Sequence, residues 1–222
     1  MKTIVLLSGG LDSTTLLYKV ADEHRVVGCL SFDYGAKHNH KELPMASYHT
    51  KKLGIPHTII SMSLMNDFFK SDLLKSGGTI PEGHYAAANM KQTVVPARNA
   101  IMLSIAAGFA ESQGAEAVAY GAHRGDHTIY RDCREEFLSP MAEALREGTD
   151  SAIELLRPFI TMNKAAIIKQ GAALGVDYAH TWSCYKGEAI HCGRCGTCVE
   201  RQEAFLLAGV SDPTVYQVHH YE

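Results

Sequence analysis

The chain begins with a continuous apolar run, residues 3–7, that leads directly into Ser8-Gly9-Gly10 and then into a helix-like segment at residues 11–21. Such a run is typical of a strand buried on both faces of a parallel sheet. Backbone amides and the dipole at the start of the following helix favour a phosphate group. The feature therefore predicts an α/β fold with a phosphate site in its first turn. A plain capped turn between strand and helix is the alternative.

The rest of the chain continues this alternation of strands and helices. Apolar runs predict further strands at residues 26–32, 57–61, 115–120 and 153–156, and helical spacing predicts helices at residues 37–53, 97–113, 134–146, 163–174 and 199–207. The helix at 97–113 is apolar nearly all round, so we expect it to be buried. Pro44 would kink the helix at 37–53 or mark its real start. The pattern predicts an α/β fold with a doubly wound, parallel, five-stranded sheet.

Polar clusters follow three of the predicted strands, at residues 8–13, 33–35 and 121–126. Ligands of such sheets bind at the carboxyl ends of the strands, so these clusters are candidate binding segments. Residues 62–96 form a connection long enough to predict a functional loop or lid.

Three charged side chains lie in predicted turns and helix starts where their charge is unfavourable without a ligand or metal ion. Asp12 would repel a phosphate unless it also held Mg²⁺ or capped the helix. Arg98 and Lys164 lie at predicted helix starts, where the dipole disfavours a cation, so we expect them to contact a ligand; solvation is the alternative. The lysine of the common phosphate loop is absent, and Lys164 could replace it.

Cys133 is a candidate thiol nucleophile, although no base is evident beside it.

Composition limits the classes of function. The net charge is −3, with no long basic run, which argues against nucleic acid as a partner. No apolar run approaches the roughly 20 residues that span a bilayer, and the first residues do not resemble a signal peptide. We therefore expect a cytoplasmic protein without a membrane partner.

Four of the six cysteines, Cys184, Cys192, Cys195 and Cys198, are spaced C-x7-C-x2-C-x2-C. Thiolates with this spacing converge on one tetrahedral metal ion, and four of them leave no open position for water. The spacing predicts a structural Zn²⁺ site, with an iron–sulfur cluster, disulfides or redox thiols as alternatives. His191 could substitute for one thiolate.

The string Ser-Gly-Gly-Leu-Asp-Ser at residues 8–13 resembles the SGGxDS loop of the N-type ATP pyrophosphatase (PP-loop) superfamily. Phe-Asp-Tyr-Gly at 32–35, Val-Pro-Ala-Arg-Asn at 95–99, the Asp-Cys-Arg stretch within 121–137, Thr-Trp-Ser-Cys at 181–184 and the terminal cysteines are similar to the 7-cyano-7-deazaguanine synthase (QueC) family. The resemblance runs from residue 2 to about 205. Departures at Ala36-Lys37, at Ala97, where glycine is usual, and at Arg131 concern the rim of the pocket.

This resemblance implies an adenine nucleotide alpha hydrolase-like (HUP-type) fold and an ATP-dependent carbon–nitrogen ligase of queuosine precursor biosynthesis. Such an enzyme converts 7-carboxy-7-deazaguanine and ammonia to the nitrile through an adenylated acid and an adenylated amide. The implied cofactors are ATP, Mg²⁺ and structural Zn²⁺, and the implied assembly is a homodimer. Residues 1–180 would form the ATP-binding domain, and residues 181–222 a zinc-binding segment packed on it.

The residue patterns and the implied reaction together predict the site residues. The ATP-binding residues would be Ser8, Gly9, Gly10, Leu11, Asp12, Ser13, Thr14, Asp33 and Tyr34, and the catalytic residues Asp12, Arg98 and Lys164. Asp132, with Asp126 as the second choice, would accept the donor edge of the base, while Arg134 or Arg98 would orient the substrate carboxylate.

Two other functions stay open from the residues. A PP-loop enzyme that thiolates tRNA would also carry cysteines, but the acidic balance and the lack of an evident RNA-binding appendage disfavour it. A nucleotide-binding sensor with a zinc knuckle would bind ATP without releasing pyrophosphate.

Overall fold

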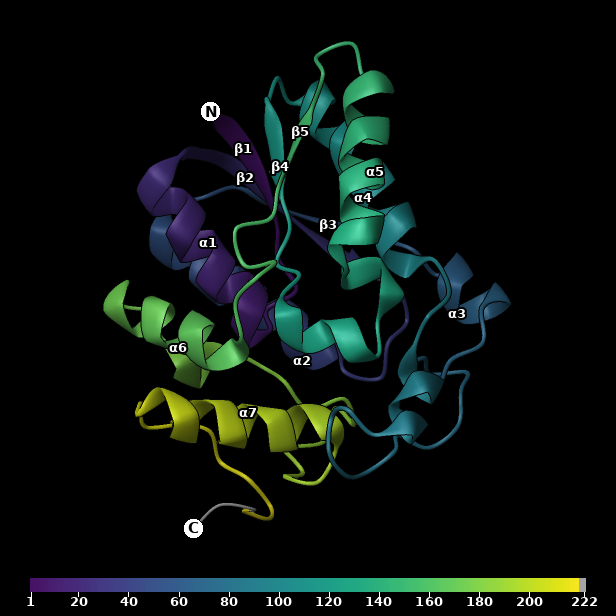
Figure 1. The fold of residues 1–222 in the computed structure, drawn as a ribbon, viewed down its shortest axis with the longest axis vertical. Helices are drawn as coiled ribbons and strands as arrows, with labels where there is room; N and C mark the ends of the chain where they lie inside the picture. Colours follow the sequence, from purple (N-terminus) through teal and green to yellow (C-terminus); the bar gives the residue numbers. More distant parts are fainter. Residues whose placement is uncertain (220–222) are drawn as a thin grey trace.

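A computed structural model, described for residues 1–219, contains a five-stranded sheet in the order β3-β2-β1-β4-β5 (Figure 1). All the strand pairs are parallel, which confirms the predicted doubly wound α/β sheet. The strands are β1 (Lys2–Leu6), β2 (Arg25–Asp33), β3 (His57–Ser61), β4 (Ala117–Ala119) and β5 (Glu154–Leu156). The strand order reverses between β1 and β4, so a ligand crevice is expected at the carboxyl ends of these two strands.

Helices cover both faces of the sheet. The α-helices are α1 (Leu11–Glu23), α2 (Asn39–Leu53), α3 (Leu64–Phe68), α4 (Arg98–Ser112), α5 (Glu135–Glu147), α6 (Lys164–Ala173) and α7 (Gly196–Ala208). Short 3₁₀ turns lie at η1 (Ala88–Thr93), η2 (Arg124–Thr128), η3 (Arg131–Cys133) and η4 (Tyr178–His180). In Figure 1, α1 and α6 lie on one side of the sheet and α4 and α5 on the other, with α7 stacked below α6.

Each face of the sheet has its own apolar core. Val5 and Leu7 pack with side chains of α1, α6 and α7, whereas Ile4 and Val118 pack with side chains of α4 and α5. Alternate residues of β1 thus enter opposite cores, as the pleat of a strand requires. The doubly buried strand explains why residues 3–7 read as a continuous apolar run.

Two expectations about helices need correction. The helix predicted at 97–113 is not buried all round, because α4 covers only one face of the sheet and leaves Ser104 and Gly108 exposed. Pro44 does not mark the start of its helix, since α2 begins at Asn39 and runs through Pro44 to Leu53.

The cysteine segment is fastened to the α/β body by buried hydrogen bonds. Arg201 on α7 is 1% exposed and donates to the Thr181 hydroxyl at 2.8 Å, the Ser183 hydroxyl at 3.2 Å and the Tyr178 carbonyl at 3.0 Å. The Trp182 amide donates to the Gly9 carbonyl at 3.0 Å. The segment that carries the cysteines therefore reaches the glycine turn.

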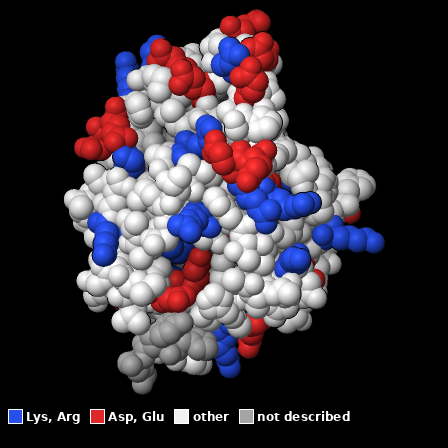
Figure 2. All heavy atoms as spheres, in the orientation of Figure 1, with Lys and Arg blue, Asp and Glu red and all other residues white. Residues whose placement is uncertain are grey.

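Within residues 1–219, no helix is both long enough and apolar enough to cross a membrane. On the face drawn in Figure 2, acidic and basic side chains lie intermingled.

Candidate active site

The turn between β1 and α1 has a geometry that only glycine fits at one position. Gly9 has a φ of +96°, and a Cβ there would lie 2.1 Å from the backbone oxygen of Glu42 on α2. Gly10, by contrast, has an ordinary φ of −75°. Hydroxyls close the turn, since Ser13 Oγ accepts from the Ser8 amide at 3.1 Å and Ser8 Oγ accepts from the Gly10 amide at 3.0 Å. The turn thus packs closely on α2 and lies in the crevice at the end of β1.

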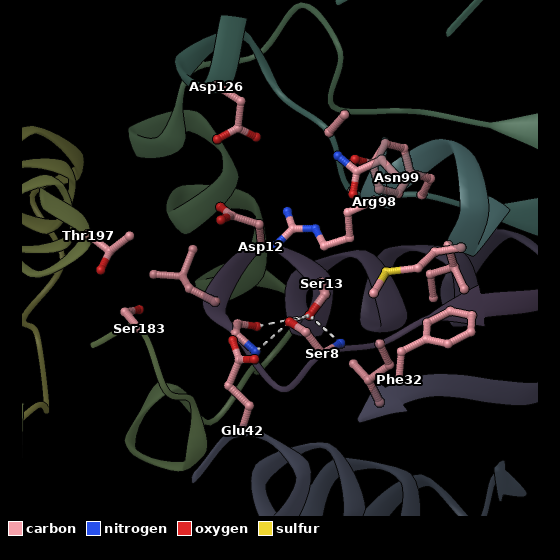
Figure 3. A pocket seen from close by; sticks show the side chains of 18 of the residues that line it. Ser8, Asp12, Ser13, Phe32, Glu42, Arg98, Asn99, Asp126, Ser183 and Thr197 are labelled. Atoms are coloured by element: carbon pink, nitrogen blue, oxygen red, sulfur yellow. Dashed lines mark hydrogen bonds between the residues drawn. The ribbon is translucent and has the colours of Figure 1, made fainter. Parts of the chain in front are cut away.

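A cleft opens above this turn and gathers many of the residues expected from the sequence. Figure 3 shows Asp12, Arg98 and Asp126 extending into the same space beside the glycine turn. The expected side chains and turn residues that line the cleft are Ser8, Gly10, Leu11, Asp12, Ser13, Tyr34, Arg98, Asp126 and Lys164. Segments far apart in the sequence therefore meet at the crevice that the strand order predicts.

A cluster of charges surrounds Asp12. Its Oδ2 lies 3.3 Å from Nζ of Lys164 and 3.6 Å from Nε2 of His123, and Lys164 Nζ also lies 2.5 Å from Glu200. Burial opposes ionisation of Asp12, but Lys164 and His123 hold the pKa of Asp12 below its usual range. Oδ1 of Asp12 is buried and has no hydrogen-bond partner in the described part of the chain. This oxygen is available to a cation or a ligand.

Asp126 is held on the other side of the same cluster. The Tyr85 hydroxyl donates to its Oδ1 at 2.9 Å, and His123 Nε2 lies 3.5 Å from its Oδ2. The Gly125 amide lies 3.0 Å from His123 Nδ1, so Nε2 is the ring nitrogen that faces both carboxylates. Tyr85 comes from the long connection 62–96, so this loop does contribute to the cleft.

Arg98 enters the cleft from the start of α4. It donates to the Tyr34 hydroxyl at 3.1 Å, and its guanidinium lies 5.4 Å from the centroid of the Tyr34 ring. The preceding residue, Ala97, has a φ of +53°, in the left-handed region that glycine adopts more easily. The departure from glycine noted in the sequence therefore lies at a strained helix cap.

Other expected residues lie away from the cleft lining. The Asp33 carboxylate accepts from the Gly35 amide at 3.3 Å within its own turn. Asp132 and Arg134 are not among the lining residues, and Arg134 Nε donates to the His127 carbonyl at 2.6 Å. Gly9 and Thr14 are buried and are not among the residues that line the cleft.

Cys133 lines the cleft, with Asn99 Nδ2 and the Tyr120 hydroxyl each 3.6 Å from its sulfur. Burial raises the pKa of the Cys133 thiol well above its usual value. A protonated thiol is a weak nucleophile, so its surroundings favour a packing role.

Sequence reasoning missed several side chains of the cleft. Glu42 reaches it from α2 and His38 from the residue just before that helix, and Glu200 reaches Lys164 from α7. No sequence pattern marked these residues, because each depends on how its helix docks on the sheet. Tyr185, which follows the first clustered cysteine, also lines the cleft and stacks on His38 at a centroid distance of 5.1 Å.

The four clustered cysteines converge as predicted. All four are buried, and their sulfurs lie within 4.8 Å of one another, with 3.9 Å between Cys192 and Cys198 and 4.0 Å between Cys184 and Cys195. Tetrahedral Zn–S bonds of ~2.3 Å require sulfur separations of about 3.8 Å, so the donor set fits Zn²⁺. His191 instead accepts from the Ser183 amide at 3.1 Å and lies outside this cluster of ligands.

Comparisons with known proteins point to one family. A family model described as "Queuosine biosynthesis protein QueC" matches residues 2–209. A Porphyromonas gingivalis protein named 7-cyano-7-deazaguanine synthase is 51% identical over 215 residues, covering 97% of each chain. A protein of the same name from Allorhizobium ampelinum is 52% identical over 221 residues, which cover 98% of this chain and 93% of the relative.

Among solved structures, an NMN synthetase from Francisella tularensis is similar over 95% of this chain and 78% of its own, with a TM-score of 0.53 and 14% identity. At this level of identity the likeness concerns the fold alone.

Proposed function

The chain belongs to the QueC family of queuosine biosynthesis proteins, and we propose on that basis that it converts 7-carboxy-7-deazaguanine and ammonia to 7-cyano-7-deazaguanine at the expense of ATP. The observation that carries the proposal is the similarity, at about half identity and over nearly the whole chain, to proteins named for this synthase. The cleft supports it, because a phosphate-binding turn and buried charges of both signs meet there.

The chemistry explains why the nucleotide is needed. Ammonia does not displace oxide from a carboxylate at a useful rate, so the substrate oxygen must first be turned into a leaving group. Transfer of AMP to the carboxylate releases pyrophosphate, and ammonia then displaces AMP to give the amide. A second transfer of AMP, to the amide oxygen, allows loss of AMP and protons to leave the nitrile. The two carboxylate oxygens depart on two molecules of AMP.

The glycine turn is the proposed site of the ATP phosphates. The amides at the start of α1 and the Ser8 and Ser13 hydroxyls would bind them, and Lys164 would supply the positive charge that the turn lacks. The free, buried Oδ1 of Asp12 fits a ligand of Mg²⁺, which would neutralise charge on the departing pyrophosphate. Arg98 would orient the substrate carboxylate.

The four thiolates are proposed to hold one structural Zn²⁺, which their separations fit. A closed tetrathiolate site has no position for substrate, so the ion would fix the fold of the segment that carries Trp182 and Tyr185 into the cleft.

Location, assembly, partners and domain division complete the proposal. We propose a cytoplasmic homodimer without nucleic acid as a partner, built from an ATP-binding domain at residues 1–180 and a zinc-binding segment at residues 181–222. Sedimentation of the zinc-loaded protein tests the dimer.

The tRNA-thiolation alternative gains no support from Cys133, whose thiol is buried and kept protonated. Mass spectrometry of a reaction with 7-carboxy-7-deazaguanine, ATP, Mg²⁺ and ammonium tests the proposal. The expected product is the nitrile, with pyrophosphate released. Accumulation of the amide alone, or release of ADP, would contradict it.

A further inference from the structure

Glu42 is a buried acid of the cleft that has no role in the proposal so far. Figure 3 shows its side chain rising from α2 towards the glycine turn. The side chain is 13% exposed, and its Oε2 lies 3.4 Å from Nε2 of His38. Its Oε1 takes no hydrogen bond within residues 1–219 and lies on the cleft. Burying a carboxyl with so few hydrogen-bond donors around it is unfavourable unless a ligand supplies the missing donors.

The neighbours of Glu42 do not supply those donors. His38 is 2% exposed, and burial lowers its pKa to about 3, so it is neutral and offers at most one N–H to the carboxyl. Arg98 exerts its charge on Glu42 but donates its hydrogen bond to the Tyr34 hydroxyl. Burial therefore prevails and raises the pKa of Glu42 to about 8 in the ligand-free protein.

Each of the other two carboxyls that line the cleft has a closer partner than Glu42. Asp12 faces Lys164 and His123, and Asp126 accepts from the Tyr85 hydroxyl. Among the acids that line the cleft in the described chain, Glu42 alone has no donor closer than 3.4 Å. Both carboxylate oxygens of Glu42 therefore have acceptor capacity to spare, whereas at Asp12 it is Oδ1 that has no partner in the described chain.

A deazaguanine offers a matching group. Its pyrimidine ring presents a ring N–H and an exocyclic amino group side by side, and two adjacent N–H donors pair in bidentate fashion with one carboxylate. Aromatic walls for such a base are present, because Tyr185 stacks on His38, the neighbour of Glu42, and Tyr34 lies beside Arg98.

We propose that Glu42 accepts the ring N–H and the amino group of the substrate base and so selects a 2-amino-4-oxo pyrimidine ring. This assignment rests on the proposed function and deepens it. It replaces Asp132, which was expected in this role from the sequence but does not line the cleft. The two donors favour the ionised carboxylate, so the bound base relieves the unfavourable burial of Glu42.

Equilibrium binding separates this role from others. The zinc-loaded protein, saturated with a non-hydrolysable ATP analogue, is titrated calorimetrically with 7-carboxy-7-deazaguanine and with the analogue that lacks the 2-amino group. The wild-type chain should bind the substrate about tenfold or more tighter than the analogue, as expected for a hydrogen bond to a charged group. Glu42→Gln keeps the size of the side chain but loses one acceptor. It should weaken substrate binding about tenfold and reduce the preference to about twofold.

Glu23→Gln is the matched control, since Glu23 is an exposed acid on α1 that pairs with Lys19 at 2.6 Å. It should leave both affinities unchanged. The assignment is wrong if Glu42→Gln keeps the wild-type preference for the substrate over the analogue that lacks the 2-amino group. It is also wrong if Glu42→Gln weakens binding of the nucleotide analogue instead of binding of the base, as loss of a contact to phosphate or metal would. Equal binding of the two bases by the wild-type chain also overturns it, even if the variant does not fold. Absence of nitrile from the wild-type reaction is a separate result that would reject the proposed function.

Discussion

Lys164→Met removes the cation on which the charge cluster of the cleft depends. The Lys164 side chain is 13% exposed, and its Nζ lies 3.3 Å from Asp12 and 2.5 Å from Glu200. Without it, two carboxylates remain close together in a protein interior, with only His123 to offset them. Methionine keeps the length and apolar stem of the side chain, so the change acts mainly on charge.

The expected loss follows from this geometry. Removing one partner of a buried ion pair destabilises a protein by about 3–5 kcal/mol. For a chain of this size, each kcal/mol lowers Tm by about 2–4 °C, so a fall of roughly 6–20 °C is expected. Burial already raises the pKa of Glu200, and the variant raises it further because Lys164 opposed that effect. An acid with a raised folded pKa destabilises the fold as pH rises, so the loss should be larger at pH 8.0 than at pH 5.5.

Urea unfolding of the zinc-loaded protein at both pH values measures the effect. Adding Glu200→Gln to Lys164→Met should restore about 1 kcal/mol or more of the free energy of unfolding, since it removes one of the unpaired charges. Lys19→Met breaks an exposed pair with Glu23 and should change stability by less than about 1 kcal/mol. A loss below about 1 kcal/mol for Lys164→Met, or the same loss at both pH values, would refute the reasoning.

Three further predictions concern the turn, the cleft and the cysteines. Gly9→Ala should destabilise the protein by about 3 kcal/mol in urea unfolding, because its Cβ meets the Glu42 backbone oxygen at 2.1 Å and φ is +96°, whereas Gly10→Ala should be milder. Glu42→Gln should stabilise the ligand-free protein, because the raised pKa of about 8 shows that ionised Glu42 is unfavourable in the fold. The gain in stability should grow from pH 5.5 to 8.5, and a gain that is constant with pH would contradict this. Cys198→Ser should abolish stoichiometric zinc in elemental analysis and lower Tm, and a brown, iron-containing wild-type protein would contradict the zinc assignment.

Local patterns were enough to predict much of this fold. The apolar run at 3–7 predicted a strand because β1 is buried on both faces, and the glycine turn predicted a helix start because Gly9 needs a positive φ. The spacing of the cysteines sufficed to predict that their sulfurs converge, since three of the four lie within one short segment.

Features that depend on helix docking were not predictable in this way. Glu42 reads as an ordinary helix acid and becomes a cleft residue only because α2 packs directly on the glycine turn. Asp132 and Arg134 lie in a stretch with strong resemblance, yet η3 places Cys133 on the cleft and directs Arg134 to a backbone carbonyl. Neighbours in sequence on a 3₁₀ turn point in different directions, which spacing alone does not resolve.

The transfer of oxygen to AMP tests the central claim most directly. With both carboxylate oxygens of 7-carboxy-7-deazaguanine labelled with ¹⁸O, the wild-type reaction with ATP and ammonium should yield an unlabelled nitrile and two molecules of AMP that each carry one ¹⁸O. The pyrophosphate should carry no label. Label in inorganic phosphate, or AMP without label, would show that the substrate oxygens do not leave by adenylation and would contradict the account.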